Sequence, residues 1–273
     1  MRPRSKLALA GAAHPQWLRP DFGIDGVGAL MSTRAGGVSE GPLGELNLGA
    51  SVGDEPARVA ENRLRLARAI GGVPVWLSQV HGTRVVRLGA AEVEATRGGV
   101  GLIEADASLT TEGGIACVVQ VADCLPVLFA APDRRGVAAA HAGWRGLAAG
   151  VLERTVEALC SAVGCEPYEL KAWLGPCIGP RQFEVGADVP AGFGVSLPHP
   201  RFVPQRSAGD KWLADLAGLA SDRLVALGLS AIEQDGSCTV EDDSRFFSHR
   251  RDRLVLGTSG RLAAAIWIDR RGA

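Results

Sequence analysis

Residues 115–122 form an almost continuous run of apolar side chains in the middle of the chain. Such a run is typical of a β-strand that is buried at the centre of a sheet. Two further β-type segments follow it, at residues 127–131 and 136–140, with Pro132 and Asp133 in the turn between them. The sequence therefore predicts a buried β-core around which the rest of the chain must fold.

Helical and β-type patterns alternate only in part along the chain. Apolar residues at helical spacing predict helices over residues 54–70, 146–163 and 211–227, the first of them capped by Asp54 and stopped by a Gly-Gly pair. Further strands are expected at residues 27–32, 75–80, 84–88, 107–110 and 263–268. This pattern favours a mixed α/β fold over a regular series of βαβ units.

No internal repeat or linker divides the 273 residues, a length that suits one large domain. Residues 1–16 are expected to form a flexible tail, although their Arg, Lys, Leu and Ala content loosely imitates a signal peptide. Residues 17–273 are expected to form a single catalytic domain, and a monomer is the favoured state.

Charge and cysteine usage narrow the class of partner. The net charge of −1 provides no general attraction to nucleic acid or to an anionic membrane. The six cysteines contain no Cys-x-x-Cys pair, so reduced thiols in the cytoplasm are the simplest interpretation. We therefore expect a cytoplasmic protein that binds neither nucleic acid nor membrane.

Three short segments each place a soft metal ligand at the end of an expected strand. They are Ser-Gln-Val-His-Gly, Ala-Asp-Cys-Leu-Pro and His-Ala-Gly-Trp-Arg-Gly, and their ligands are His81, Cys124 and His141. Two imidazoles and one thiolate suit a catalytic zinc ion, which takes three protein ligands and leaves a position open. Each residue alone has an ordinary structural interpretation, such as a buried core cysteine, and the prediction depends on the three agreeing.

Four other residues near these segments are candidates for the site. Asp123 ends an apolar strand and needs a polar partner. Arg145 lies in a Gly-rich turn before a helix, where backbone amides favour an anion, although close packing alone would also explain the turn. Arg250 belongs to a basic segment that either clamps an acidic group or is an exposed loop. Cys177, in a Gly-Pro-Cys-Ile-Gly-Pro turn, is either a wall residue, a redox thiol or a fourth ligand that would close the metal site.

Together with residues 33–39, 47–49, 175–179 and 248–251, these segments resemble the YfiH or laccase-domain family over about residues 17–268. The resemblance implies one mixed α/β domain with layered sheets, similar in fold to the catalytic domain of cytotoxic necrotizing factor. It implies that His81, Cys124 and His141 bind Zn²⁺ or Cu²⁺. The family is associated with three activities: polyphenol oxidation, purine nucleoside phosphorolysis with adenosine deamination, and editing of peptidoglycan precursors.

Histidine and methionine counts separate these activities in part. The chain has five histidines, two of them already in the first site, which are too few for a multinuclear copper cluster. A blue-copper site usually has an axial methionine, and the only methionines of the chain are Met1 and Met31. We therefore expect a metal-dependent purine nucleoside phosphorylase that uses adenosine, inosine, guanosine and methylthioadenosine, with adenosine deamination as a second activity.

The phosphorylase hypothesis assigns roles to further side chains. Phosphate would be bound by Arg34, Arg145 and Arg250, the nucleoside by Asn47 and Gln79. In deamination Asp123 would carry the proton. The alternatives are a Cys-His hydrolase in the precursor-editing role, with Cys124 as nucleophile and His141 as base, a single-copper polyphenol oxidase, and a non-catalytic binding protein.

We predict one zinc ion per chain. Cys124→Ala should lose both zinc and activity while circular dichroism shows an intact fold, because it removes one of only three soft ligands. Cys177→Ser is the matched control and should retain zinc in elemental analysis. Zinc that is retained in Cys124→Ala, or lost in Cys177→Ser, would contradict the three-ligand set.

Overall fold

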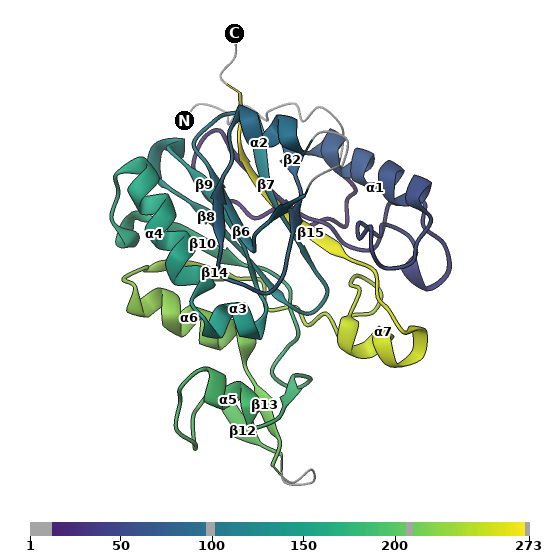
Figure 1. The fold of residues 1–273 in the computed structure, drawn as a ribbon, viewed down its shortest axis with the longest axis vertical. Coiled ribbons are helices and arrows are strands. Elements are labelled where there is room, and N and C mark those ends of the chain that lie inside the picture. Colours follow the sequence, from purple (N-terminus) through teal and green to yellow (C-terminus); the bar gives the residue numbers. More distant parts are fainter. Residues whose placement is uncertain (1–12, 97–101, 206–209, 271–273) are drawn as a thin grey trace, which may run out of the picture.

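The computed structural model describes residues 13–96, 102–205 and 210–270, which form a sandwich of four layers (Figure 1). Two β-sheets pack face to face at the centre, and helices cover their outer faces. The expected mixed α/β fold with layered sheets is confirmed. Most of the expected tail, residues 1–12, lies outside the described residues, whereas Ala13 packs against the core together with Trp17.

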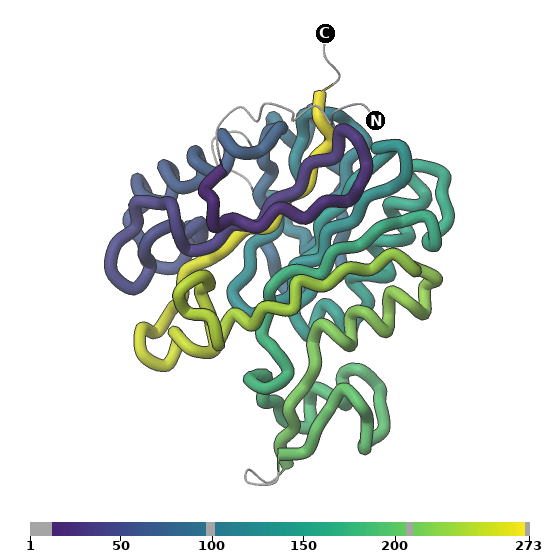
Figure 2. Tube along the Cα trace, turned by 180° about the vertical axis from the view of Figure 1, so that it is seen from behind, coloured from purple at the N-terminus to yellow at the C-terminus, as the bar shows by residue number. Residues whose placement is uncertain are grey.

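The first central sheet has four strands within the described residues. β15 lies between β1 and β7 and is antiparallel to both, and β2 is parallel to β7. Figure 2 shows the N-terminal β1 running beside the C-terminal β15. The strands, in spatial order, are β1 (Val27–Met31), β15 (Leu262–Ile268), β7 (Ile115–Val121) and β2 (Val73–Val75).

The second central sheet has six strands in the described part of the chain. Its middle is an antiparallel set formed by β10, β8, β9 and β6, and a parallel strand is added at each edge. The strands, in spatial order, are β14 (Ala231–Gln234), β10 (Lys171–Leu174), β8 (Leu125–Ala130), β9 (Val137–Ala142), β6 (Ala107–Thr110) and β4 (Val85–Arg87).

Both faces of these sheets are buried, which explains the continuous apolar runs in the sequence. Successive side chains of a strand point to opposite faces. In β7, Val119 therefore packs between the two sheets, while Val118 packs against the layer that contains α1. In β8, Leu128 faces the other sheet and Phe129 faces the helices α4 and α6.

The helices cover the two outer faces. α1 packs on the four-stranded sheet through Leu66, and α4 and α6 pack on the six-stranded sheet through residues such as Leu159 and Leu224. The α-helices of the described residues are α1 (Pro56–Ala69), α2 (Ala90–Ala95), α3 (Trp144–Ala148), α4 (Val151–Val163), α5 (Asp188–Gly192), α6 (Leu216–Ala226) and α7 (His249–Leu256). None of the helices in this part of the chain has the length and apolarity needed to span a bilayer.

A small three-stranded sheet and α5 project from one end of the sandwich (Figure 1). Phe183, Val185 and Phe202 of this region belong to the same buried cluster as Phe129 of the six-stranded sheet. The described residues therefore form one domain. The strands of the projection are β11 (Glu184–Val185), β13 (Trp212–Ala214) and β12 (Phe202–Pro204).

Two of the three expected helices begin at a different residue and are shorter. The segment expected to be helical from residue 211 starts with strand β13, and α6 begins only after Asp215, whose carboxylate accepts a hydrogen bond from Gly218 N at 2.8 Å. Asp54 does not cap α1, because its carboxylate accepts hydrogen bonds from Ser39 Oγ and Asn47 Nδ2 instead.

The helix expected at residues 146–163 is divided into α3 and α4. Gly150 separates them with φ of +98°, a conformation that only glycine adopts without strain.

The single strand expected at residues 75–80 is also divided. Trp76 separates β2 from β3 (Leu77–Ser78), and these two strands belong to different sheets. β3 pairs with β5 (Ile103–Glu104). The basic segment that contains Arg250 is no loop but the first turn of α7, which Ser248 caps.

The connection between the two sheets positions the functional residues. The chain leaves the four-stranded sheet at the end of β7 and enters the six-stranded sheet at β8, with Asp123 and Cys124 in the short link. Because β9 pairs with β8, its end lies beside this link, and His141 is placed opposite Pro126.

Packing between the two sheets should dominate stability. Leu128→Ala should lower the free energy of unfolding by about 2–5 kcal/mol, because it leaves a cavity between two rigid sheets. The matched control is Leu254→Ala in α7, where the side chain is 90% exposed and the change should be within about 0.5 kcal/mol. Urea denaturation measures both, and equal effects would contradict the assignment of this layer as the core.

Candidate metal centre

The side chains of His81, Cys124 and His141 converge at one end of the sandwich. Their ligand atoms all lie within 4.8 Å of one another. Cys124 Sγ is 3.7 Å from His81 Nε2, and the two imidazole rings meet edge to face with centroids 4.8 Å apart. The structure therefore brings together the three residues that the sequence predicted as ligands. Within the described residues this is the only such group of three.

A buried carboxylate that the sequence analysis did not identify holds two of these ligands in place. Asp106 Oδ1 is 2.8 Å from His141 Nδ1 and accepts a hydrogen bond from the backbone N–H of His81 at 2.9 Å. Its other oxygen accepts from the N–H groups of Val80 and Gly82. When His141 donates through Nδ1, its Nε2 presents a lone pair for a metal ion. Asp106 thus orients one ligand and shapes the turn that carries the other.

The glycines of the His-Ala-Gly-Trp-Arg-Gly segment allow the ligands to approach. A Cβ atom at Gly143 would lie 2.6 Å from His81 Cδ2 and 3.0 Å from Cys124 Sγ. A Cβ atom at Gly146 would lie 2.9 Å from the carbonyl oxygen of Gly82. Any larger residue would push the His81 turn away from Cys124, so these glycines are required by the close approach itself.

Cys124 and His141 shift each other's protonation. Burial alone would raise the pKa of the Cys124 thiol, but attraction to His141 and hydrogen bonds with both imidazoles outweigh it and lower this pKa to about 6. Burial opposes a charged His141, yet Cys124 and Asp106 together raise its pKa to about 9. Without a metal ion the site therefore favours a thiolate beside an imidazolium, and the thiolate is the form that binds metal.

The donor set fits a zinc ion. Two imidazole nitrogens and one thiolate are typical of catalytic zinc sites, which keep a fourth position open. Cys177 does not belong to the group: its thiol donates to the carbonyl oxygen of Ile178, and burial raises its pKa. Met31 is buried between the two sheets and does not line the site, so it does not supply the axial ligand of a blue-copper centre.

His81, Cys124 and His141 lie in the wall of a cavity of about 470 Å³. Its wall includes the polar side chains of Gln79, Gln120, His249, Arg63 and Arg261. Within the described residues that line it there is no Asp or Glu. The cavity is therefore large enough for a small organic ligand, and apart from the Cys124 thiolate it is lined by cationic and neutral groups.

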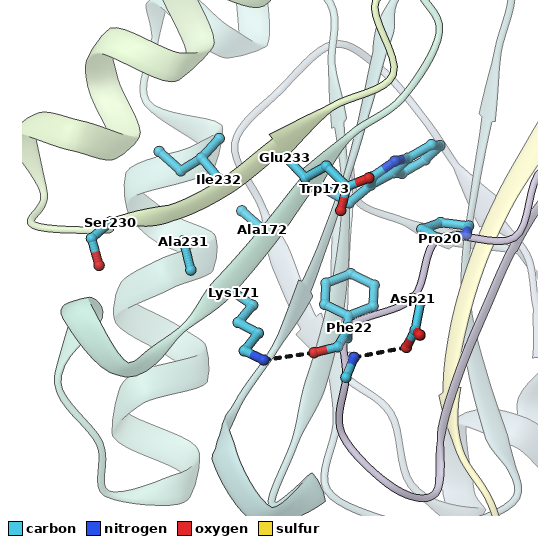
Figure 3. Close-up of a pocket in the computed structure, with 11 residues that line it drawn as sticks. Pro20, Asp21, Phe22, Lys171, Ala172, Trp173, Ser230, Ala231, Ile232 and Glu233 are labelled. Atoms are coloured by element: carbon cyan, nitrogen blue, oxygen red, sulfur yellow. Dashed lines mark hydrogen bonds between the residues drawn. The ribbon is translucent and has the colours of Figure 1, made fainter. Parts of the chain in front are cut away.

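A second cavity of about 420 Å³ lies at the edge of the six-stranded sheet (Figure 3). Its lining includes Phe22, Trp173 and Lys171, whose ammonium group donates to the carbonyl oxygen of Phe22 at 2.7 Å. It contains no histidine or cysteine among its described lining residues. The cavity at the metal ligands is therefore the candidate functional site.

The structure gives several of the predicted nucleoside-binding and phosphate-binding residues other contacts. Gln79 lines the cavity, but its amide pairs with the backbone of Gln120, donating to O at 2.8 Å and accepting from N at 2.7 Å. Asn47 is fully buried, and its side-chain oxygen accepts from Arg261 N and Gly49 N. Arg34 donates to the carbonyl oxygens of Gly44 and Asp243, so it stabilises loops.

Arg145, Arg250 and Asp123 do not line the cavity either. Arg145 is exposed and stacks on Trp144 at 4.4 Å, while the guanidinium of Arg250 donates to the carbonyl oxygen of Glu184. The Asp123 carboxylate accepts hydrogen bonds from Thr239 Oγ1, Ser248 Oγ and Arg250 N, which anchors the first turn of α7. The assigned roles of these residues in phosphate binding and proton transfer stay predictions.

The sequence analysis assigned no role to four residues of the site: Asp106, Arg63, Gln120 and His249. A signal existed for two of them. Asp106 directly precedes a buried strand, and Arg63 interrupts the apolar face of α1. Both are polar residues where an apolar one is expected, which indicates a specific partner. Gln120 has no comparable local signal, whereas His249 lies in the segment 248–251 that contributes to the family resemblance. Arg261 ends the segment Gly-Thr-Ser-Gly-Arg, in which a Ser departs from the family pattern, so the sequence leaves its role open.

The fold and the site define a single-domain α/β protein with a His-Cys-His centre that opens into a cavity. The chain belongs to the laccase-domain family, whose sequence model, described as multi-copper polyphenol oxidoreductase laccase, matches residues 28–269. The resemblance that the sequence motifs indicated is therefore confirmed.

Relatives of similar length include named enzymes and solved structures. A purine nucleoside phosphorylase of Pseudomonas aeruginosa is 46% identical over 258 residues, which cover 93% of this chain and 98% of that protein. Purine nucleoside phosphorylase YfiH of Escherichia coli is 46% identical over 256 residues, covering 93% and 97%. The crystal structure of a Neisseria meningitidis protein matches with a TM-score of 0.83 at 41% identity, covering 93% of this chain and 100% of that one. The structure of YlmD from Geobacillus stearothermophilus matches with a TM-score of 0.84 at 31% identity, covering 93% and 96%.

Removal of the Asp106 charge should weaken metal binding. Asp106→Asn should lower zinc affinity about 10- to 100-fold, because His141 and the His81 turn lose the group that orients them. The measurement is competition with a chromogenic chelator. The matched control is Asp222→Asn, which should bind zinc normally. Asp222 lies on α6, and its exposed carboxylate forms an ion pair with Arg201. An unchanged affinity in Asp106→Asn would mean that the carboxylate does not support the site.

The low pKa of Cys124 should be visible in its reactivity. In metal-free protein the rate of alkylation by iodoacetamide at Cys124 should rise through about pH 6 and level off by pH 8, because a lowered pKa keeps the thiolate present above that point. Peptide mass mapping identifies the thiol. His141→Gln should shift the midpoint upward, and added zinc should protect Cys124. A midpoint near the ordinary cysteine value of about 8.5 would contradict the predicted ion pair.

Proposed function

We propose that this protein is a zinc-dependent purine nucleoside phosphorylase, a pentosyltransferase that cleaves a purine nucleoside with inorganic phosphate. The proposal rests on the His-Cys-His centre, whose three residues line a cavity of about 470 Å³. No Asp or Glu occurs among the described residues of the cavity wall. Relatives named purine nucleoside phosphorylase, which align over nearly the whole chain, support the same activity.

The proposed reaction transfers the ribosyl group from nitrogen to oxygen. An oxygen of monohydrogen phosphate forms a bond to C1′ of the ribose while the bond from C1′ to the purine nitrogen breaks. The electron pair of the broken bond goes to the purine, which takes up one proton as phosphate gives one up. The products are the free purine and ribose 1-phosphate, and no oxidant or reductant is needed.

The cavity wall supplies groups for both substrates. The Gln120 side chain lines the cavity and makes no hydrogen bond to other described residues, so its amide is available to a purine edge. Gln79 keeps the strand that carries Gln120 in place through its two hydrogen bonds to the Gln120 backbone. We therefore assign base recognition to Gln120 and a positioning role to Gln79.

His81, Cys124 and His141 would hold the zinc ion in this proposal. Zinc bound there would supply a Lewis acid with an open coordination position. Copper is the alternative metal, but the buried position of Met31 argues against a blue-copper centre. The same observation argues against the hypothesis of a single-copper polyphenol oxidase.

The proposed nucleosides are adenosine, inosine, guanosine and methylthioadenosine, with adenosine deamination as a second activity. A zinc ion held by His81, Cys124 and His141 would supply the Lewis acidity that activates water for deamination. This reaction also requires a proton carrier at the cavity. Asp123 was the expected carrier, and its three hydrogen bonds point to an anchoring role instead. We infer that phosphorolysis is the main reaction of this site.

A Cys-nucleophile hydrolase is the second candidate, because one observation favours it. A Cys124 thiolate beside a protonated His141 is also the arrangement that such hydrolases use. In that case water completes the reaction, and no phosphate is consumed. Phosphate dependence therefore separates the two functions.

Inosine cleavage by zinc-loaded protein should require phosphate and release hypoxanthine and ribose 1-phosphate in equal amounts. The rate should rise to saturation in a phosphate titration, followed by chromatography of both products. Zinc-free protein and Cys124→Ala should both be inactive, because they lack the complete centre. Cleavage that ignores phosphate and yields free ribose would instead identify a hydrolase.

A further inference from the structure

Two arginine side chains line the cavity beside the metal ligands without an acidic partner. Arg63 projects from α1, and Arg261 directly precedes β15. Among the described residues no carboxylate lies within ion-pair distance of either guanidinium. Burial lowers the pKa of both groups. Attraction to Cys124 and Asp123 offsets part of this effect at Arg261. A partly buried cation without a carboxylate at ion-pair distance is costly, so the cavity favours an anion.

One backbone segment fixes both arginines. Arg63 Nε donates to the carbonyl oxygen of Leu48 at 3.0 Å, and Leu48 N donates to the carbonyl oxygen of Arg261 at 3.1 Å. Asn47 Oδ1 also accepts from Arg261 N at 2.9 Å. The absence of a side chain at Gly49 makes room for Arg261, since a Cβ atom there would lie 2.7 Å from Arg261 Cγ. The segment Asn47-Leu48-Gly49 is thus a support on which both guanidinium groups are held.

Both arginines keep donors free for a ligand. Arg63 stacks on Trp76 at 4.3 Å, and its two terminal nitrogens make no hydrogen bond to described residues. Arg261 uses Nη1 on Ser259 and Gly260, while its Nη2 and Nε make none. His249 adds a buried Nδ1 atom without a partner in the described residues. A tetrahedral oxyanion with several acceptor oxygens matches this set of donors.

We propose that Arg63 and Arg261, held by the Asn47-Leu48-Gly49 segment, form the binding site for inorganic phosphate in the cavity beside the His-Cys-His centre. This inference rests on the proposed function, because it assigns the place of the second substrate. It replaces Arg145 as the main phosphate ligand, since Arg145 is exposed on α3 and does not line the cavity. Phosphate held here would share the cavity with the ribose whose C1′ it attacks.

Kinetics with two substrates test the assignment. Arg63→Gln and Arg261→Gln should each raise the KM for phosphate about 10- to 100-fold, as expected for losing hydrogen bonds between charged groups. The KM for inosine should change much less, and zinc content should stay at one per chain. Arg63→Lys keeps a charge and a long stem but loses the planar fork, so it should raise the KM for phosphate by an intermediate factor.

The matched control is Arg68→Gln, an exposed arginine on the same helix, which should leave both KM values unchanged. Thermal melting of each variant tests whether the fold survives. If Arg63→Gln fails to fold after losing its stacking on Trp76, Arg63→Lys and Arg261→Gln carry the test. An unchanged KM for phosphate in the folded variants, or a rise confined to Arg145→Gln, would overturn the proposed phosphate site.

A binding measurement without nucleoside separates this inference from the proposed function. Isothermal titration with inorganic phosphate should show binding to wild-type zinc-loaded protein and weaker binding to both glutamine variants. If this holds while inosine is not phosphorolysed, the anion site stands and the phosphorylase function is wrong. If phosphorolysis occurs but phosphate binds the variants normally, the function stands and the site is wrong.

The phosphate group of a nucleotide is the other source of the same oxyanion. Inosine 5′-monophosphate should be a poorer substrate than inosine, because its phosphate would compete with the inorganic one. If the nucleotide is the better substrate and loses that advantage in Arg63→Gln and Arg261→Gln, the arginines bind the substrate's own phosphate, and the assignment to inorganic phosphate is overturned.

Discussion

The Asp106 carboxylate is the interaction on which the arrangement of the site depends. It has no solvent-exposed surface and accepts hydrogen bonds from His141 and from three consecutive backbone N–H groups of residues 80–82. Burial alone would raise its pKa, but these hydrogen bonds, that of His141 first, lower it, so Asp106 remains ionised. One buried charge thereby joins β6, β9 and the turn after β3, and without it two of the three ligands would lose their orientation.

The same region shows how a sandwich of two sheets creates a site. The chain passes from one sheet to the other through the link that contains Asp123 and Cys124. Asp123 ties this link to the first turn of α7, which brings His249 to the cavity. The residues that anchor the link and those that would act on a ligand are therefore neighbours in sequence but have separate tasks.

The name of the family and the chemistry of this site point in different directions. A multi-copper oxidase needs several closely spaced copper centres, whereas the described residues contain one group of three soft ligands. That group lies in the wall of a cavity whose arginines, with no described carboxylate at ion-pair distance, suit an oxyanion and whose Gln120 amide suits a purine base. A reaction between a nucleoside and phosphate uses each of these groups, while the reduction of oxygen would use neither the cations nor the amide.

The sequence by itself determined the buried strands, the mixed α/β class and the three soft ligands, because these depend on local composition. The apolar run of β7 and the ligand at the end of each segment are visible without any knowledge of long-range contacts. Local signals also explain the errors: Asp215 starts α6 later than the periodicity suggests, and Gly150 divides α3 from α4. Only the tertiary structure decided which polar groups reach the cavity, since Arg63 and Arg261 lie almost 200 positions apart and meet through the backbone of Leu48. Arginines such as Arg34 and Arg250 looked equally suitable in the sequence, but their guanidinium groups are occupied by carbonyl oxygens elsewhere in the fold.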